Sequence, residues 1–250
     1  MTFAAGPGKR TVLLASAADE VALGLPARLS RPDIVVVTPA DLSQPGWYFR
    51  PGAGGSAIVA EGQVLGSEQI AAVVTRLPWV SESELPQIVP ADRAYVAAEM
   101  HAFLVAWLSE LACPVANRPS PNCLCGPFWR HERWVAEAAR AGLVVVRARR
   151  SVDAHGAQDA QDAQGAPARL QRVISITVVG KRCFGEGDEA LREHALSLAR
   201  ATGVETLTVH FGDAGAGLRF LTANPWPCLE DDEVASALLD HLVAPTGAGR

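Results

Sequence analysis

Four side chains that form strong hydrogen bonds stand where predicted strands end, at Arg76, Asn117, Arg118 and Asn224. The carboxyl ends of strands in an open α/β sheet point into one crevice, so we expect these side chains to line it. An indole ring joins them at Trp226, inside the sequence Asn-Pro-Trp-Pro. A guanidinium, amides and a ring in one crevice could bind a peptide or another flat ligand. We therefore predict that Arg76, Asn117, Arg118 and Trp226 bind substrate.

Three further tryptophans fall near these positions. Trp79 follows the strand that ends at Arg76, and Trp129 and Trp134 fall five residues apart on one predicted helix. They could extend an aromatic wall of the crevice. Packing in the core is the alternative explanation for each ring taken singly.

Other site chemistries are not supported by the spacing. Cys123-x-Cys125 followed by His131 invites a zinc site, but zinc motifs use Cys-x2-Cys with a second pair at a set distance, and the sequence has no such pair. The glycine-rich residues 52–56 lead into a predicted hairpin rather than a helix, unlike a phosphate-binding loop. No Ser/His/Asp or Cys/His pattern marks a nucleophile. We assign no metal ligand and no catalytic residue.

The first half of the chain predicts a parallel sheet. Residues 11–16, 34–37 and 72–76 are continuous apolar strands, and residues 18–29 between the first two read as a helix. Continuous apolar strands separated by helices indicate a parallel sheet covered on both faces. We predict a loop over the Pro- and Gly-rich residues 39–55.

A small hairpin and a long helix follow from local patterns. Residues 57–65 predict the hairpin, with Gly62 in its turn. Residues 91–111 predict the longest helix of the chain. Its expected apolar stripe comprises Tyr95, Ala98, Ala102, Val105 and Leu108, widened by Met100, Phe103, Leu104 and Trp107. This stripe would pack against the sheet, or alternatively form a subunit contact.

The second half begins with a strand to Asn117, a Pro-rich loop and a helix over 128–141. Residues 151–169 hold a degenerate Ala-Gln-Asp repeat without an apolar face, which predicts a flexible surface insertion. Acidic residues 230–233 predict the first turn of a terminal helix over 233–243, where the helix dipole favours negative charge.

The last third, Arg172 to Leu229, predicts strand, turn, strand, helix, strand, hairpin, strand and then Asn224-Pro225. This order resembles the closing half of the ATP-grasp fold, the fold of many ATP-dependent carboxylate–amine ligases. The opening resembles the first domain of RimK-like ATP-grasp ligases that mature peptides. The predicted fold class is α/β, with a pre-ATP-grasp-like parallel-sheet domain over 1–117 and a reduced ATP-grasp-like domain over 118–250.

The resemblance also implies where a cofactor would bind. In the family an Asp and a Glu on these strands hold magnesium, before the Asn-Pro. The corresponding positions here read His210 and Thr222, and Asn224 could still donate one oxygen. His210, Thr222 and Asn224 are therefore the candidate cofactor-binding residues. The family's lid subdomain, with two lysines, is replaced by residues 151–169, which contain no lysine.

Composition narrows the class of protein. The 250 residues are 49% apolar and 20% charged, as in globular proteins. A net charge of −5 argues against binding to nucleic acid. No apolar run approaches the ~20 residues of a membrane span. The odd number of cysteines, five, fits a reducing cytoplasm better than a disulfide framework.

Three functions remain open, of which one, an enzyme of unrelated chemistry that reuses the crevice, has no residue pattern that names its reaction. The first is a degenerate, non-catalytic substrate-binding or scaffolding subunit of a biosynthetic or peptide-modifying system, with no cofactor. It would bind a peptide or small molecule and act beside a protein partner or as a homo-oligomer. The alternative is an active ligase that forms a C–N bond with ATP and magnesium at an abbreviated site. It would use Asn224, His210 and either Arg147 or Arg149 on the phosphates.

Overall fold

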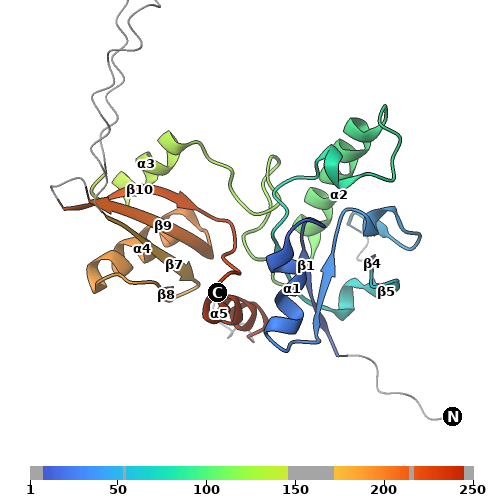
Figure 1. Ribbon diagram of the computed structural model, residues 1–250, viewed down its shortest axis with the longest axis horizontal. Coiled ribbons are helices and arrows are strands. Elements are labelled where there is room, and N and C mark those ends of the chain that lie inside the picture. Colours follow the sequence, from blue (N-terminus) through green and yellow to red (C-terminus); the bar gives the residue numbers. More distant parts are fainter. Residues whose placement is uncertain (1–7, 53–54, 146–171, 214–216, 245–250) are drawn as a thin grey trace, which may run out of the picture. The chain divides into compact units, whose positions relative to one another are not determined.

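The computed structural model describes residues 8–52, 55–145, 172–213 and 217–244 (Figure 1). The predicted insertion over 151–169 lies outside these ranges, as do Arg147 and Arg149. The contacts divide the chain into two compact units. Unit 1 comprises Met1–Phe128, Val204–Thr206 and Pro225–Arg250, and unit 2 comprises Trp129–Gly203 and Leu207–Asn224. The domain boundary after residue 117 stays a prediction, and the contact-based division differs from it by placing the C-terminal segment in unit 1.

Unit 1 contains a three-stranded parallel sheet of order β2-β1-β6, as the apolar runs predict. Its strands are β1 (Arg10–Leu14), β2 (Ile34–Val37) and β6 (Ile70–Thr75). Val12 lies between Val35 and Val73 in the register. The predicted strand to Asn117 is reduced to a parallel bridge between Val115 and Val73.

Both faces of this sheet are covered. On one face Val12 and Leu14 share a core with Leu104 and Trp107 of α2 (Arg93–Glu110). Leu13 alternates to the other side and is also buried. Helices α1 (Glu20–Arg28) and α5 (Asp232–Val243) pack against β2 and β6. Burial on both sides explains why these strands are apolar without alternation.

Polar contacts join α1 and α5. Arg28 pairs with Asp232 and donates to the carbonyl oxygen of Leu229, and Arg31 pairs with Asp240. These contacts, together with burial of one face of α5, explain why the C-terminal helix belongs to unit 1.

A second sheet of unit 1 is antiparallel, in the order β3-β4-β5. The hairpin of β4 (Gly55–Ala60) and β5 (Gln63–Gly66) is confirmed. Glu61 and Gly62 turn it with φ of 53° and 74°, the left-handed pair that suits a two-residue hairpin loop. The predicted loop over 39–55 is wrong in part, because β3 (Tyr48–Arg50) pairs with β4. Its three residues are too few to show a strand period.

Helix α2 is confirmed, and its predicted apolar stripe is right at Leu104, Trp107 and Leu108 but wrong at Tyr95, Ala98 and Ala102. The structure buries Ala97, Leu104, Trp107 and Leu108, whereas the side chain of Tyr95 is 70% exposed. The helix carries apolar residues on all of its sides, so periodicity alone does not select the buried face. Trp107 decides the orientation by donating from Nε1 to Ser56 Oγ at 3.2 Å and packing edge-on against Trp47.

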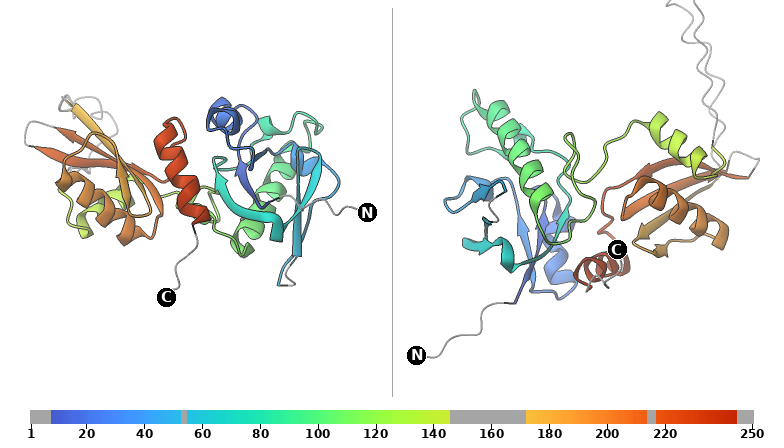
Figure 2. Two further views of the ribbon diagram at one scale, coloured as in Figure 1. Left: turned by 90° about the horizontal axis from the view of Figure 1, so that it is seen from below. Right: turned by 180° about the vertical axis from the view of Figure 1, so that it is seen from behind.

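Unit 2 is a four-stranded sheet of order β10-β9-β7-β8, covered by two helices (Figure 2). Its elements are β7 (Arg172–Val179), β8 (Arg182–Phe184), β9 (Thr206–Asp213), β10 (Leu218–Asn224), α3 (His131–Arg140) and α4 (Glu189–Thr202). Helix α3 packs on β10, α4 packs on β7, and the helices touch each other, so both cover one face. Ile176, Phe211 and Phe220 are buried with them.

Local signals fix the ends of these helices. Asp188 accepts from the backbone N–H of Leu191 at the start of α4, and Gly203 ends the helix with φ of 67°. Helix α3 begins at His131, so the prediction that Trp129 belongs to it is wrong. Trp129 still packs on Trp134, with ring centroids 4.7 Å apart.

Three short 3-10 helices complete the described elements, at Asp41–Ser43, Ser67–Gln69 and Glu82–Glu84. In the part of the chain that the structure describes, no helix has the length and hydropathy of a membrane span. All five cysteines lie in that part and are free thiols.

Candidate functional site

A cavity of about 340 Å³ opens in unit 1 where β1 and β6 end. The backbone after β1 contributes Ser16 and Asp19 to its lining, and the backbone after β6 contributes Arg76 and Trp79. The remaining lining residues are Ala18, Leu77, Pro78, Ser81, Glu84 and Trp226. We call this space the strand-end cavity. The structure thus places Arg76 and Trp226 in the crevice at the carboxyl ends of parallel strands, the location expected for a ligand site.

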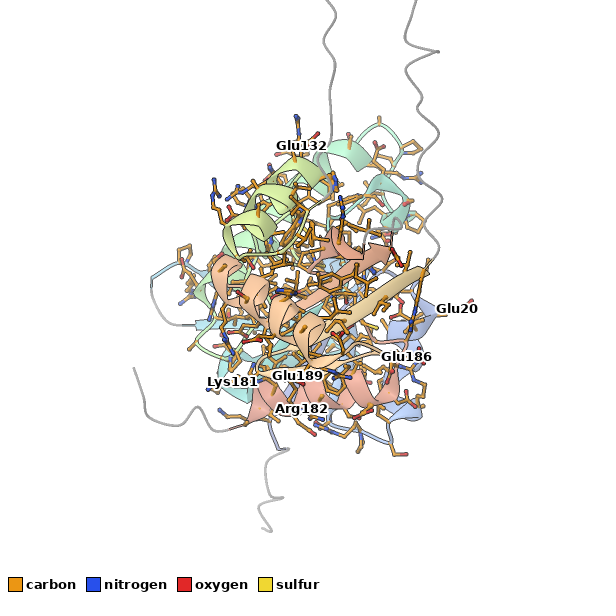
Figure 3. The ribbon with its side chains drawn as sticks, turned by 90° about the vertical axis from the view of Figure 1, so that its left-hand side faces the viewer. Glu20, Glu132, Lys181, Arg182, Glu186 and Glu189 are labelled. Atoms are coloured by element: carbon orange, nitrogen blue, oxygen red, sulfur yellow. The ribbon has the colours of Figure 1, made fainter. Side chains whose placement is uncertain are left out.

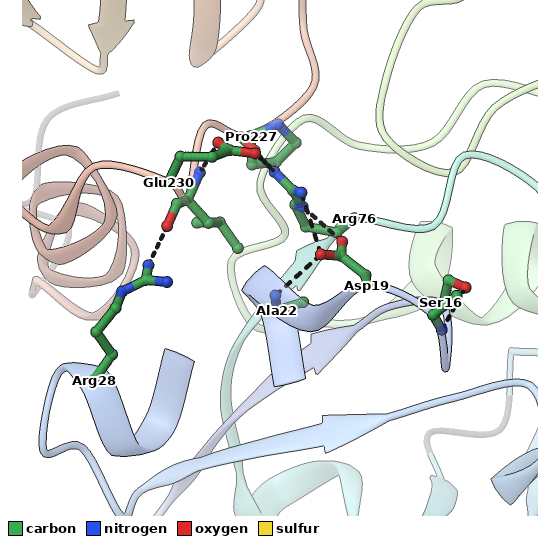
Figure 4. Close-up of polar contacts among 9 residues, drawn as sticks. Ser16, Asp19, Ala22, Arg28, Arg76, Pro227 and Glu230 are labelled. Carbon is green, nitrogen blue, oxygen red and sulfur yellow. Dashed lines mark hydrogen bonds and ion pairs between the residues drawn. The ribbon is translucent and has the colours of Figure 1, made fainter. Parts of the chain in front are cut away.

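Arg76 is the centre of a buried ionic network at this cavity (Figure 4). Its Nε and Nη2 donate to the two carboxylate oxygens of Asp19 at 2.9 and 3.3 Å. Its Nη1 donates to the carbonyl oxygen of Pro227 at 2.8 Å and to Glu230 Oε1 at 3.1 Å. The guanidinium also lies over the ring of Trp226, 5.5 Å from its centroid. Four of the five N–H donors of the guanidinium are therefore committed to the protein.

The network balances charge that burial would otherwise penalise. The side chains of Arg76 and Asp19 are 8% and 12% exposed, whereas that of Glu230 is 57% exposed. Burial opposes the charge of Arg76, but hydrogen bonds and attraction to Asp19 and Glu230 outweigh it and raise the pKa of Arg76. Burial also tends to raise the pKa of Glu230, but a backbone N–H and Arg76 lower it overall.

Asn117 uses its whole amide as a clamp on the backbone. Its Nδ2 donates to the carbonyl oxygens of Thr206 at 2.7 Å and Pro225 at 2.8 Å. Its Oδ1 accepts from the N–H groups of Glu205 and Thr206. The residue is buried and has φ of 49°, a left-handed conformation that asparagine tolerates better than most residues. Both donors and both acceptor sites of the amide are thus committed to the backbone.

Arg118 closes the end of a helix. Its guanidinium donates to the carbonyl oxygens of Leu108 and Ser109 of α2 and to those of Leu111 and Cys113 just beyond it. The carbonyls of Leu108 and Ser109 belong to the last turn of α2, where carbonyls lack partners within the helix, and a cation at this end suits the helix dipole. The structure therefore places Asn117 and Arg118 in backbone contacts, and does not bring them together with Arg76 in the strand-end cavity.

The predicted cofactor residues lie together on the sheet of unit 2. His210 and Thr222 are direct partners in the β9–β10 register, and Asn224 is the partner of Thr208. Alternation puts all of them on one face, opposite the apolar face that α3 and α4 cover. This polar face is defined by Ser175, Thr177, Thr208, His210, Thr222 and Asn224. Arg219 lies on the same face through its register partner Gly212.

The polar face does not fit magnesium. Magnesium requires hard oxygen ligands, chiefly carboxylates. The strands of this sheet contain one acidic residue, Asp213, and alternation from His210 places it on the other face. His210 instead contacts Ser175 Oγ through Nδ1 at 2.8 Å, and burial lowers the pKa of this imidazole. Among the described residues, no three His, Cys, Asp or Glu side chains gather as a metal site would require.

Lys181 lies outside this arrangement. It occupies the turn between β7 and β8, next to Gly180 with φ of 58°, and it is exposed together with Arg182 and Glu186 (Figure 3). Its place is that of a solvated turn residue.

The thiols of Cys123 and Cys125 are buried neighbours in unit 1. A hydrogen bond from Cys125 lowers the pKa of Cys123 to about 7, and burial raises the pKa of Cys125. The loop that carries them is anchored by the N–H of Leu124, which donates to the carbonyl oxygen of Pro78 at 2.8 Å. Pro78 lines the strand-end cavity, so this loop supports one wall of it.

Sequence reasoning missed the acidic residues that line the strand-end cavity, Asp19 and Glu84, and the acidic partner of Arg76 beside it, Glu230. Asp19 reads as the start of a helix, and it does cap α1 by accepting from Ala22, while its other contacts reach Arg76. Glu230 reads as part of the first turn of α5, but the helix starts at Asp232 with Asp231 as its N-cap. Glu84 lies in a short 3-10 helix without any sequence signal. An arginine directly after a buried strand, as Arg76 is, indicates only that some acidic partner lies nearby and does not identify it.

Comparison with known proteins shows the fold. No protein-family model and no curated protein sequence matches the chain. Solved structures of ATP-grasp ligases do match it. The macrocyclase MdnB from Microcystis aeruginosa MRC is 16% identical with a TM-score of 0.69, over 95% of this chain and 100% of the other. A second match is a RiPP-associated ATP-grasp ligase from Chryseobacterium gregarium, in complex with ADP and a leader and core peptide. It is 11% identical with a TM-score of 0.66, over 95% of this chain and 98% of the other. The ATP-grasp ligase PsnB complexed with minimal precursor is 15% identical with a TM-score of 0.64, over 93% and 98%.

Proposed function

We propose that this chain, which has the fold of the ATP-grasp ligases, is a non-catalytic relative of them. It binds a peptide or small-molecule substrate within a biosynthetic or peptide-modifying enzyme system and needs no cofactor. The observation that carries the proposal is the pairing of His210 with Thr222 on the polar face. An imidazole held by Ser175 and a neutral hydroxyl stand where the fold family would place a pair of carboxylates, so the charge needed to hold magnesium against a triphosphate is missing.

A peptide is the ligand class that the comparisons favour. Among the structures similar to this chain, the RiPP-associated ligase contains a leader and core peptide and PsnB contains a minimal precursor. In this chain the strand-end cavity has the aromatic and polar walls that a peptide side chain requires. We place the protein in a reducing cytoplasm, in keeping with its free thiols, beside a partner enzyme or in a homo-oligomer.

The test is calorimetry on the whole chain with ATP and ADP, each with and without magnesium, followed by an assay of ATP hydrolysis with an added carboxylate and amine. We expect no magnesium-dependent nucleotide binding and no hydrolysis. Magnesium-dependent binding in the micromolar range, or hydrolysis that requires both substrates, would overturn the proposal.

A second candidate function is an active ATP-dependent ligase with an abbreviated site. One observation favours it. Among the described residues, Nε of Arg219 is buried and makes no hydrogen bond, and this residue lies on the same face as His210. A phosphate oxygen could accept from that group. Under this alternative, His210→Ala and Arg219→Ala would each abolish the hydrolysis measured above.

A further inference from the structure

We propose that the strand-end cavity binds a cationic side chain of a peptide, a lysine or an arginine, against Trp79 and Glu84. The inference rests on the proposed function, because it takes a peptide as the ligand. It goes beyond that function by naming the side chain that is recognised and the residues that recognise it.

Arg76 cannot make this cavity a carboxylate site. Four of its five N–H donors point to Asp19, Pro227 and Glu230, and its face lies against Trp226. An incoming carboxylate would have to displace one of these partners and leave Asp19 buried without its cation, which is costly. The positive charge at this cavity is therefore already neutralised by the chain itself.

Glu84 supplies the negative charge that remains. Among the lining residues Asp19 and Glu84 are acidic and Arg76 alone is basic, so carboxylates exceed cations. Asp19 is used by Arg76, and Glu84 accepts a hydrogen bond from the neutral backbone N–H of Ala17 at 3.3 Å. Glu84 is half-buried, so water screens it less than it screens a fully exposed carboxylate. A cation entering the cavity meets this charge.

Trp79 supplies an open ring. Its side chain is 49% exposed although it is large and apolar, and it lies edge-on to Phe128, itself 66% exposed, with ring centroids 6.2 Å apart. An exposed indole face attracts a guanidinium or an ammonium group, and the aliphatic stem of the same side chain packs on the ring. An accessible indole beside a carboxylate that has no cation partner among the described residues selects a cation over a neutral side chain.

The size of the cavity agrees with a single side chain. Its volume of about 340 Å³ is near the lower end of the range for small-molecule pockets. The serines at positions 16 and 81 line the same space and offer further hydrogen bonds to N–H donors. The rest of the peptide would lie outside, over the exposed Trp79 and Phe128.

The experiment is a titration of the whole chain with N-acetyl-arginine amide at low salt. Tryptophan fluorescence and calorimetry monitor the binding. The neutral isostere N-acetyl-citrulline amide is the matched ligand. We expect the arginine probe to bind with a Kd on the order of 1 mM, and the citrulline probe to bind about tenfold more weakly. The lysine analogue should behave like arginine.

The matched variants are Glu84→Gln and Glu82→Gln, which remove the same charge from one 3-10 helix. Glu82 is exposed and does not line the cavity. Glu84→Gln should weaken arginine binding about tenfold, and Glu82→Gln should leave it within about twofold. Trp79→Ala should weaken it about fivefold.

Three results would overturn the inference: equal affinity for arginine and citrulline, equal effects of the two glutamine variants, or no binding of either probe. Equal affinity for both probes would leave the proposed peptide-binding function standing, because the cavity would then bind without reading charge. Failure of the proposed function shows instead in the nucleotide measurements, which involve neither probe.

Discussion

The side-chain amide of Asn117 grips both polar groups of one backbone residue, Thr206, which is 89 positions later in the chain. Nδ2 donates to the carbonyl oxygen at 2.7 Å, and Oδ1 accepts from the N–H at 3.1 Å. Asn117 also lies very close to the backbone of Gly126. A Cβ added to Gly126, which has φ of 110°, would lie 2.9 Å from the Cβ of Asn117. This amide therefore acts as a structural joint.

We predict that Asn117→Ala lowers the free energy of unfolding by about 3 kcal/mol, because buried backbone groups lose their partners and alanine adopts the left-handed conformation at a cost. Chemical denaturation measures the loss. Asn117→Asp is the sharper comparison, since it keeps the shape and the acceptor but turns a carboxylate toward two carbonyl oxygens. A loss below about 1 kcal/mol in both variants would contradict the clamp.

Arg76 and its two carboxylates differ in burial, so their removal should differ in cost. Arg76→Met leaves Asp19 buried without a cation and should cost about 3–5 kcal/mol, whereas Glu230→Gln affects an exposed partner and should cost about 1 kcal/mol or less. Urea denaturation of both variants checks this order. Adding Asp19→Asn to Arg76→Met should restore part of the loss, since asparagine still caps α1 and needs no cation. No restoration would mean that the charge on Asp19 is not the cause.

The pKa of His210 is lowered by burial from its ordinary value of 6.5. The unfolded chain therefore binds a proton that the folded chain resists, and stability should fall as the pH drops through 6.5 and level off below the folded pKa. Above pH 6.5 this imidazole contributes no pH dependence. Denaturation between pH 5 and 8 should show a shallower decline for His210→Gln than for the unchanged chain. Identical slopes of stability against pH for the two proteins would show that protonation of His210 does not destabilise the fold.

The register predicts how to introduce a metal site. Because His210 and Thr222 are direct partners across β9 and β10, the double variant His210→Asp, Thr222→Glu would place two carboxylates side by side. We expect it to bind Mg²⁺ or Mn²⁺ in calorimetry and to unfold at a higher temperature when the metal is present. The unchanged chain should show neither effect.

The matched control is Thr208→Asp, Thr222→Glu, whose carboxylates are offset rather than opposite. Equal metal binding by both double variants would mean that charge alone, and not the position of the pair, governs binding.

Much of the fold follows from local sequence. The apolar runs around Val12, Val35 and Val73 need only burial on two faces to become a parallel sheet, and Asp188 and Gly203 mark the ends of α4 by their own backbone chemistry. The ATP-grasp resemblance, drawn from the order of such elements, is confirmed as a fold by solved structures. The short strand β3 escaped prediction because its pairing with β4 is a tertiary contact.

The sequence by itself thus determined most of the strands and helices, since their formation depends mainly on neighbours along the chain. Only the tertiary structure decided what the polar residues do, because their partners are distant in sequence. Arg76 ends the predicted strand and directly follows β6 in the structure, but Glu230, 154 residues later, pairs with it. Asn117 ends a predicted strand, but Thr206 occupies its amide. Hydrogen-bond and ion-pair partners depend on where folding brings the backbone, so a candidate site read from residue types alone includes side chains that the fold has already used.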